Sequence, residues 1–147
     1  MAARKRAFAV TTARDTTFEG GGLRPVFEYR DLGIRGATGG RFGAHVIRAR
    51  RRLGRPMGLH RHTLDFQMVY ILKGWAKFHY EGEGEFTVRK GDCIHQPPGI
   101  HHDLLDYSKD LEMLEIVTPA KFATAAAKPK GTAQPKPKPT AKKKGKR

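Results

Sequence analysis

A chain of 147 residues is long enough for one domain with a hydrophobic core, and a second full domain is not expected. The formal net charge of +15 belongs to the ends of the chain, because residues 121–147 contain ten Lys and Arg and no acid, and Arg-Lys-Arg at 4–6 adds three more. Residues 7–120 hold 16 basic against 14 acidic residues, which excludes a strongly basic body.

The single cysteine, Cys93, excludes an intrachain disulfide and is expected to be a buried small hydrophobic residue. No apolar run approaches the ~18 residues of a membrane span, and the N-terminal residues lack the apolar stretch of a signal peptide. We therefore expect a cytoplasmic protein with no membrane partner.

The predicted elements begin after a flexible N-terminal arm, residues 1–22, which ends in Glu-Gly-Gly-Gly. Residues 23–32 predict a strand, and residues 39–53 predict a turn that leads into a second strand. From Leu59 onward, short apolar and aromatic runs alternate with Gly and Pro turn signals every eight to twelve residues. This rhythm predicts an all-β antiparallel sandwich or barrel over residues 23–120.

The C-terminal segment, residues 121–147, is a basic tail rich in Lys, Pro and Ala. Its start allows a short helical turn through residues 120–127. Residues 128–147 have no apolar side chain larger than Ala and are predicted to be disordered, because they bury too little surface to offset chain entropy. Such a tail would bind nucleic acid weakly through charge alone, and a solubilising extension without a partner is the alternative.

Two histidines, His60 and His62, are separated by one residue. Residues two apart share one face of a strand but not of a helix, so the pair can converge on one metal ion only if this stretch is extended. A pair of partly exposed strand histidines is the alternative. If Gln67 on the following strand faces inward, so do Val69 and Ile71, and after the Gly74 turn Phe78 and Tyr80 follow.

The spacing around this pair forms two motifs. In the first, Gly54 is followed by five residues, His60-x-His62, four residues, Gln67, six residues and Gly74. In the second, Gly91 is followed by five residues, Pro97-x-Gly99, two residues, His102, three residues and Asp106. This pattern, over about residues 42–118, resembles the cupin family, with Gln67 at a Glu position and Asp106 at an Asn position.

The resemblance implies a double-stranded β-helix, or jelly-roll barrel, of the cupin type with one divalent transition metal inside. His60, His62, Gln67 and His102 would be the metal ligands. Three imidazoles suit Zn, Fe, Ni or Cu, and Mn also fits with an oxygen donor. That His102 folds back beside His62 comes from the resemblance alone. We expect His101 to face outward and His45, His79 and His95 to have structural or solvent roles.

The fold does not determine the reaction, so the reaction has to be inferred from the residues of the site. With neutral Gln67, the ion keeps its full charge and acts as a strong Lewis acid, which favours an isomerase or lyase acting on a small, oxygen-rich anionic metabolite. Tyr80 and Asp106 are candidates for moving a proton. A non-enzymatic ligand-sensing or storage protein is the first alternative, and a metal-dependent dioxygenase is the second. A homodimer is expected through an exposed N-terminal strand edge.

Overall fold

The computed structural model describes residues 7–127, so the predicted disordered residues 128–147 and the basic residues 4–6 lie outside the described part. Ten strands and one short helix make up these residues. The elements are β1 (Phe27–Asp31), α1 (Ile34–Ala37), β2 (Gly43–Ala49), β3 (His60–Thr63), β4 (Phe66–Lys73), β5 (Trp75–Tyr80), β6 (Gly84–Arg89), β7 (Cys93–His95), β8 (His102–Tyr107), β9 (Glu112–Thr118) and β10 (Ala123–Ala126).

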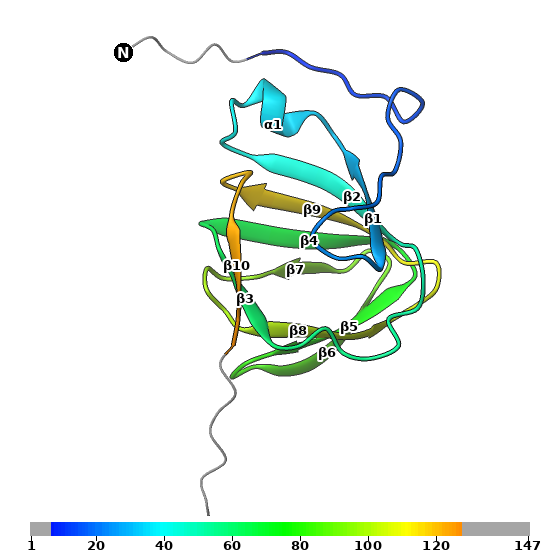
Figure 1. The fold of residues 1–147 in the computed structure, drawn as a ribbon, viewed down its shortest axis with the longest axis vertical. Coiled ribbons are helices and arrows are strands. Elements are labelled where there is room, and N and C mark those ends of the chain that lie inside the picture. The colour runs from blue at the N-terminus through cyan, green and yellow to red at the C-terminus, as the bar shows by residue number, and fades with distance from the viewer. Residues whose placement is uncertain (1–6, 128–147) are drawn as a thin grey trace, which may run out of the picture.

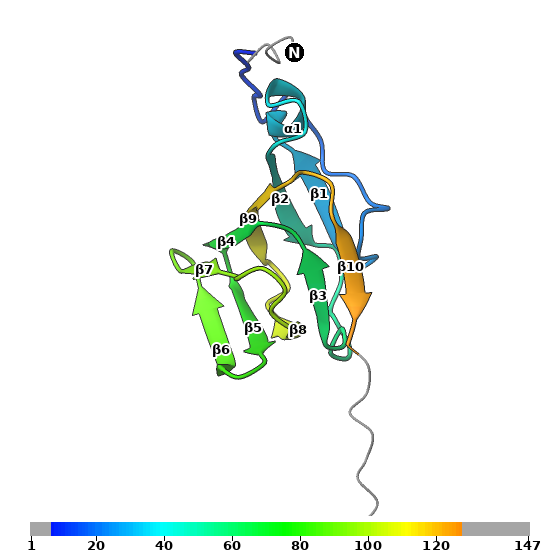
Figure 2. The same ribbon diagram turned by 90° about the vertical axis from the view of Figure 1, so that its left-hand side faces the viewer.

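The strands form two five-stranded sheets, with the orders β1-β2-β9-β4-β7 and β10-β3-β8-β5-β6. Figures 1 and 2 show the sheets as two layers with the core between them. The paired strands within each sheet run antiparallel, and β9 and β8 each join strands that are distant in sequence. The predicted all-β sandwich of antiparallel strands is confirmed.

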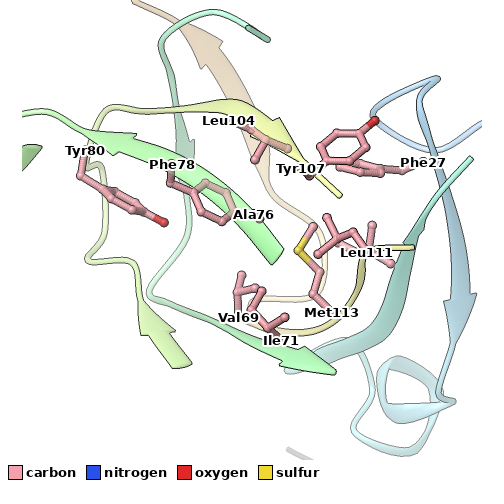
Figure 3. Close-up of a cluster of buried hydrophobic side chains, with 11 residues drawn as sticks. Phe27, Val69, Ile71, Ala76, Phe78, Tyr80, Leu104, Tyr107, Leu111 and Met113 are labelled. Carbon is pink, nitrogen blue, oxygen red and sulfur yellow. The ribbon is translucent and has the colours of Figure 1, made fainter. Parts of the chain in front are cut away.

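The core follows the two-residue period of the central strands. Along β4, Val69 and Ile71 are buried, whereas Tyr70 and Leu72 are exposed. Along β5, Ala76, Phe78 and Tyr80 are buried, as Figure 3 shows for the side chains that meet between the sheets. The inward positions predicted from the sequence for β4 and β5 are therefore the buried ones.

The C-terminal part of the described chain differs from the expected tail. Residues 123–126, for which the pattern allowed a helical turn, form β10, which pairs antiparallel with β3 (Figure 1). Beyond the strand, the amide of Ala127 donates to the carbonyl of Leu59 at 2.9 Å. The open edge of β3 offers backbone partners that a helical turn would leave unpaired, and these long-range hydrogen bonds outweigh the local helix propensity of alanine.

Two further differences lie near the N-terminal half and at a sheet edge. The end of the predicted arm is bound to the fold, because Glu19 and Tyr29 exchange two backbone hydrogen bonds of 2.9 Å. Cys93 is exposed, contrary to the expected burial, because β7 is the edge strand of its sheet and this side chain faces away from the core.

No helix in residues 7–127 has the length and hydropathy needed to span a membrane.

The position of β10 generates a test with two truncations. Removing residues 128–147 leaves β10 intact, so the midpoint of thermal unfolding, Tm, should stay within about 2 °C of the full chain. Removing residues 121–147 deletes β10 and exposes the edge of β3, so Tm should fall by about 5–10 °C, as a loss of about 2 kcal/mol implies. Equal Tm values for the two truncations would contradict a structural role for β10.

Candidate metal centre

Three buried histidines from neighbouring strands meet in one cluster. His60 and His62 lie on β3, and His102 begins β8, directly opposite His60 in the strand pairing. The ring centroids are 4.4 Å apart for His60 and His102, 5.1 Å for His60 and His62, and 5.0 Å for His62 and His102. One nitrogen from each ring lies within 4.8 Å of the other two, which is an arrangement that could hold a metal ion.

The outer nitrogen of each ring has a fixed partner. His60 Nδ1 lies 2.7 Å from the carbonyl of Gly58, and His102 Nδ1 lies 3.1 Å from the carbonyl of Ile100. A carbonyl only accepts, so Nδ1 carries the proton on both rings and Nε2 keeps its lone pair. His62 Nδ1 lies 2.8 Å from the Thr124 hydroxyl on β10, which can accept in the same way. Nε2 is therefore the ligand atom of His60 and His102, and it is also that of His62 when the Thr124 hydroxyl accepts from Nδ1.

The rings are neutral at physiological pH. Burial, with a smaller contribution from His60, lowers the pKa of His62 to about 4. Burial also lowers the pKa of His102 to about 4 and holds the pKa of His60 below its ordinary value. Neutral imidazoles are the form that binds transition metals, so the donor set fits such an ion.

A fourth polar side chain, Gln67 on β4, is held by the partly buried acid Glu115. Gln67 is 3% exposed, and its Nε2 donates to Glu115 Oε2 at 2.8 Å. The other oxygen of Glu115 lies 2.9 Å from His45 Nε2. An ionised carboxylate only accepts hydrogen bonds, so the amide nitrogen must face Glu115 and the Gln67 oxygen is left for other partners.

The Glu115 carboxylate is ionised despite its position. Burial acts to raise its pKa, but the hydrogen bonds and charge of His45 and the hydrogen bond from Gln67 outweigh burial, so the pKa of Glu115 lies below its ordinary value. The family motif has a negatively charged residue where this chain has Gln67. In this fold the negative charge is instead on Glu115, which is hydrogen-bonded to Gln67.

Glu115 was missed by the sequence analysis, which also assigned His45 to a structural or solvent role. A signal existed in the sequence, because Glu115 shares the strand parity of Met113 and Val117, and both of these neighbours are buried. An acidic residue at an inward position between two core residues predicts a hydrogen-bonding or charged partner inside the fold, because an unpaired buried charge is costly.

Gln96 is a second buried amide that the sequence analysis did not single out. It is 2% exposed, its Oε1 accepts a hydrogen bond from the Tyr80 hydroxyl at 2.9 Å, and its Nε2 lies 3.4 Å from His102 Nε2. Burial raises the pKa of Tyr80 above its ordinary value. Tyr80 thus connects to the histidines through Gln96, and its ring packs against His102 with centroids 5.9 Å apart.

Asp106 lies apart from this cluster. Its side chain is exposed and accepts a 2.8 Å hydrogen bond from the amide of Tyr107. It is not among the residues that line the cavity next to the histidines. His101 lies away from the centre as well, because its Nδ1 contacts Glu81 Oε2 at 2.7 Å.

The histidines border a cavity of about 250 Å³ between the sheets. Its polar lining includes His45, His60, His62, Gln67, Gln96, His102 and Glu115, and its apolar lining includes Phe27, Ile47, Val69, Phe78, Leu104 and Met113. Residues 22–24 and Phe122 also line it, and because Gly22 and Leu23 are exposed, the cavity opens on their side. The volume suits a small metabolite.

Comparison with known proteins points to one family. The sequence model of the cupin domain matches residues 53–117, which run from before β3 to the end of β9. No curated protein matches the chain in sequence. An RmlC-like cupin from Shewanella frigidimarina NCIMB 400 is similar in structure, with a TM-score of 0.61 and 16% identity over 78% of this chain and 94% of that protein.

Two larger proteins contain a similar fold. The DMSP lyase DddQ from Ruegeria pomeroyi DSS-3 has a TM-score of 0.52 and 23% identity, over 63% of this chain and 46% of the lyase. Oxalate decarboxylase from Bacillus subtilis, described with Mn(II) centres, has a TM-score of 0.57 and 15% identity, over 74% of this chain and 30% of the decarboxylase. This chain thus spans less than half of either protein, and the likeness is one of fold.

The lowered pKa values predict how stability depends on pH. His62 and His102 titrate near 4 in the fold but near 6.5 when unfolded, so the unfolded chain binds more protons between these values. Stability should be fully present above about pH 6.5 and should fall toward pH 4, by up to about 1.4 kcal/mol per pH unit for each histidine. Urea unfolding of chelator-treated protein measures this slope. His102→Gln should remove the contribution of one histidine, and so of one proton, from this slope. An unchanged slope would contradict burial of a neutral His102.

Proposed function

We propose, on the premise that residues 53–117 of this chain are a cupin domain, that the protein holds one divalent transition metal and converts a small, oxygen-rich anionic metabolite by non-redox chemistry. The reaction type is isomerase or lyase. One observation carries the proposal: three buried neutral imidazoles each offer a ring nitrogen within 4.8 Å of the other two, beside a cavity of about 250 Å³.

The proposed ligands are the Nε2 atoms of His60, His62 and His102, with Gln67 Oε1 as the fourth. The contact between Gln67 Nε2 and Glu115 supports this role, because it keeps the amide oxygen turned away from the carboxylate. Zn, Fe, Mn and Ni all fit three imidazoles and one amide oxygen. The Mn(II) centres of the structurally similar oxalate decarboxylase agree with such a metal.

An ion held in this way would supply Lewis-acid polarisation of a bound substrate oxygen. The side chain best placed to accept a proton is Glu115, which is ionised, lines the cavity and contacts His45 at 2.9 Å. We assign this role to Glu115 in place of Asp106, whose exposed side chain lies outside the cavity lining. Tyr80 is left with a positioning role, because its hydroxyl fixes Gln96 against His102.

Non-redox chemistry follows from where the negative charge lies. Glu115 is separated from the histidines by the Gln67 amide, so the proposed ligand set is neutral. A neutral ligand set stabilises a more oxidised ion poorly and leaves the Lewis acidity of a divalent ion high. The name of the structurally similar DMSP lyase agrees with a bond-breaking reaction.

The first prediction of this proposal concerns metal content. The purified protein should hold about one transition-metal ion per chain, because three imidazoles bind such ions far better than Mg or Ca. The His60→Ala/His102→Ala variant should fold but lose the ion. The matched control, His79→Ala/His95→Ala, removes two histidines outside the cavity lining and should keep it. Elemental analysis measures both, and full retention in the first variant would contradict the assigned centre.

The second prediction concerns the pair Gln67 and Glu115. Gln67→Glu alone places two carboxylates in contact, so one of them must be protonated or displaced, and Tm should fall by about 5 °C or more. The exchange Gln67→Glu/Glu115→Gln restores one donor and one acceptor and moves the charge next to the ion. The exchange variant should recover most of the Tm and bind Zn²⁺ at least as tightly as the wild type, with weaker Lewis acidity. An unchanged Tm in Gln67→Glu would show that the two side chains are not coupled.

Enzyme and sensor are separated by a direct assay. The Zn²⁺-, Mn²⁺- and Ni²⁺-loaded protein is incubated with a panel of small hydroxy-, keto- and dicarboxylic acids, and products are followed by mass spectrometry while Tm is recorded. Turnover that requires the metal supports the proposal. A raised Tm without turnover would indicate a ligand-sensing or storage protein instead.

A further inference from the structure

The opening of the cavity is bordered by a segment from the N-terminal side, which we call the strap and define as residues 19–24. Its first residue is paired with Tyr29 on β1 through two backbone hydrogen bonds. Gly22 then lies against the Tyr29 ring so closely that a Cβ at this position would be 2.4 Å from ring atom Cε2. Only glycine allows this approach, so the strap is seated on the ring.

Arg24 ends the strap and is fixed by two backbone contacts. Its amide donates to the Tyr29 hydroxyl at 3.2 Å, and its carbonyl accepts from the amide of Phe27 at 3.1 Å. The second contact closes a four-residue turn in which Pro25 occupies the position that favours proline. The backbone of Arg24 is therefore held in place where the residue lines the cavity.

Arg24 lines the same cavity as His60 and His62. The guanidinium forms no ion pair within 4.0 Å of any carboxylate in residues 7–127. Glu115, the acidic residue that lines the same cavity, is already bonded to Gln67 and His45. A half-buried arginine thus lines the cavity with its charge uncompensated by an acid.

We propose that Arg24 is the specificity-determining residue of this site and binds a carboxylate of the substrate while a second oxygen group of the same molecule lies at the histidine cluster. The inference rests on the proposed function and narrows the substrate class to small acids that carry a carboxylate and a second oxygen function. A guanidinium presents a planar fork of donors that matches the two oxygens of a carboxylate. The cavity of about 250 Å³ has room for a small acid of this kind.

Malonate and acetate are suitable probes, because both offer one carboxylate to the metal and only malonate offers a second. The full chain is loaded with Co²⁺, whose visible absorption reports ligand binding at the ion, and each acid is titrated. The wild type should bind malonate at least about 10-fold more tightly than acetate. Arg24→Gln should weaken malonate binding by about 10- to 100-fold and change acetate binding by less than about 3-fold.

Two further variants control the result. Arg61→Gln removes an exposed arginine on β3 between His60 and His62, outside the cavity lining, and should bind both acids as the wild type does. Arg24→Lys keeps the charge but not the fork, so its loss of malonate affinity should be smaller, about 3- to 10-fold. If Arg24→Gln fails to fold, Arg24→Lys takes its place in the comparison with the wild type. Circular dichroism checks the fold of each variant, and the amount of bound Co²⁺ checks the metal site.

The outcomes separate this inference from the proposed function. Equal malonate affinity in the wild type and both Arg24 variants would overturn the role of Arg24, while malonate binding by the wild type would leave the proposed function standing. A wild-type protein that holds Co²⁺ but changes its spectrum with neither acid would overturn both.

Discussion

The hydrogen bond from Gln67 to the Glu115 carboxylate is the contact on which the organisation of the site depends. A carboxylate buried without partners would be protonated, so its charge requires donors on both oxygens. His45 and Gln67 supply them at 2.9 and 2.8 Å. The sheet order β2-β9-β4 provides this arrangement, because His45 lies directly opposite Glu115 and Gln67 lies diagonally across from it. One sheet thus carries the acid, and the other carries the three histidines.

The parts of the site that sequence could predict are those set by short-range periodicity. The spacing of His60 and His62 requires a strand if they are to act together, and β3 has that form with both side chains buried. The inward positions of Val69 and Phe78 follow from the same two-residue period. The placement of His102 beside His60 was available only through the family motif, because the two residues meet across a strand pair that no local pattern specifies.

The parts that sequence could not predict depend on pairings between distant segments. Glu115 reaches Gln67 and His45 only because β9 lies between β2 and β4, and Thr124 reaches His62 only because β10 adds to the edge of β3. Local propensity favoured another conformation for the alanine-rich residues 123–126, and the free edge of the sheet decided the outcome. From the sequence alone, Gln67 in place of a motif glutamate indicated a site without a negative charge. The fold places a negative charge on Glu115 of the neighbouring strand β9.

This displacement makes residues 67 and 115 a coupled pair. Two carboxylates in contact cannot both ionise inside the fold, so a glutamate at 67 and a glutamate at 115 exclude each other, and the glutamine determines which position carries the charge. With the charge on Glu115, residue 67 offers the cavity a neutral amide, and the acid keeps its negative charge through the hydrogen bonds from Gln67 and His45. Arg24 then lies on the cavity wall as the uncompensated positive group. An anionic substrate entering between them would be oriented by both charges, with its carboxylate toward Arg24 and away from Glu115.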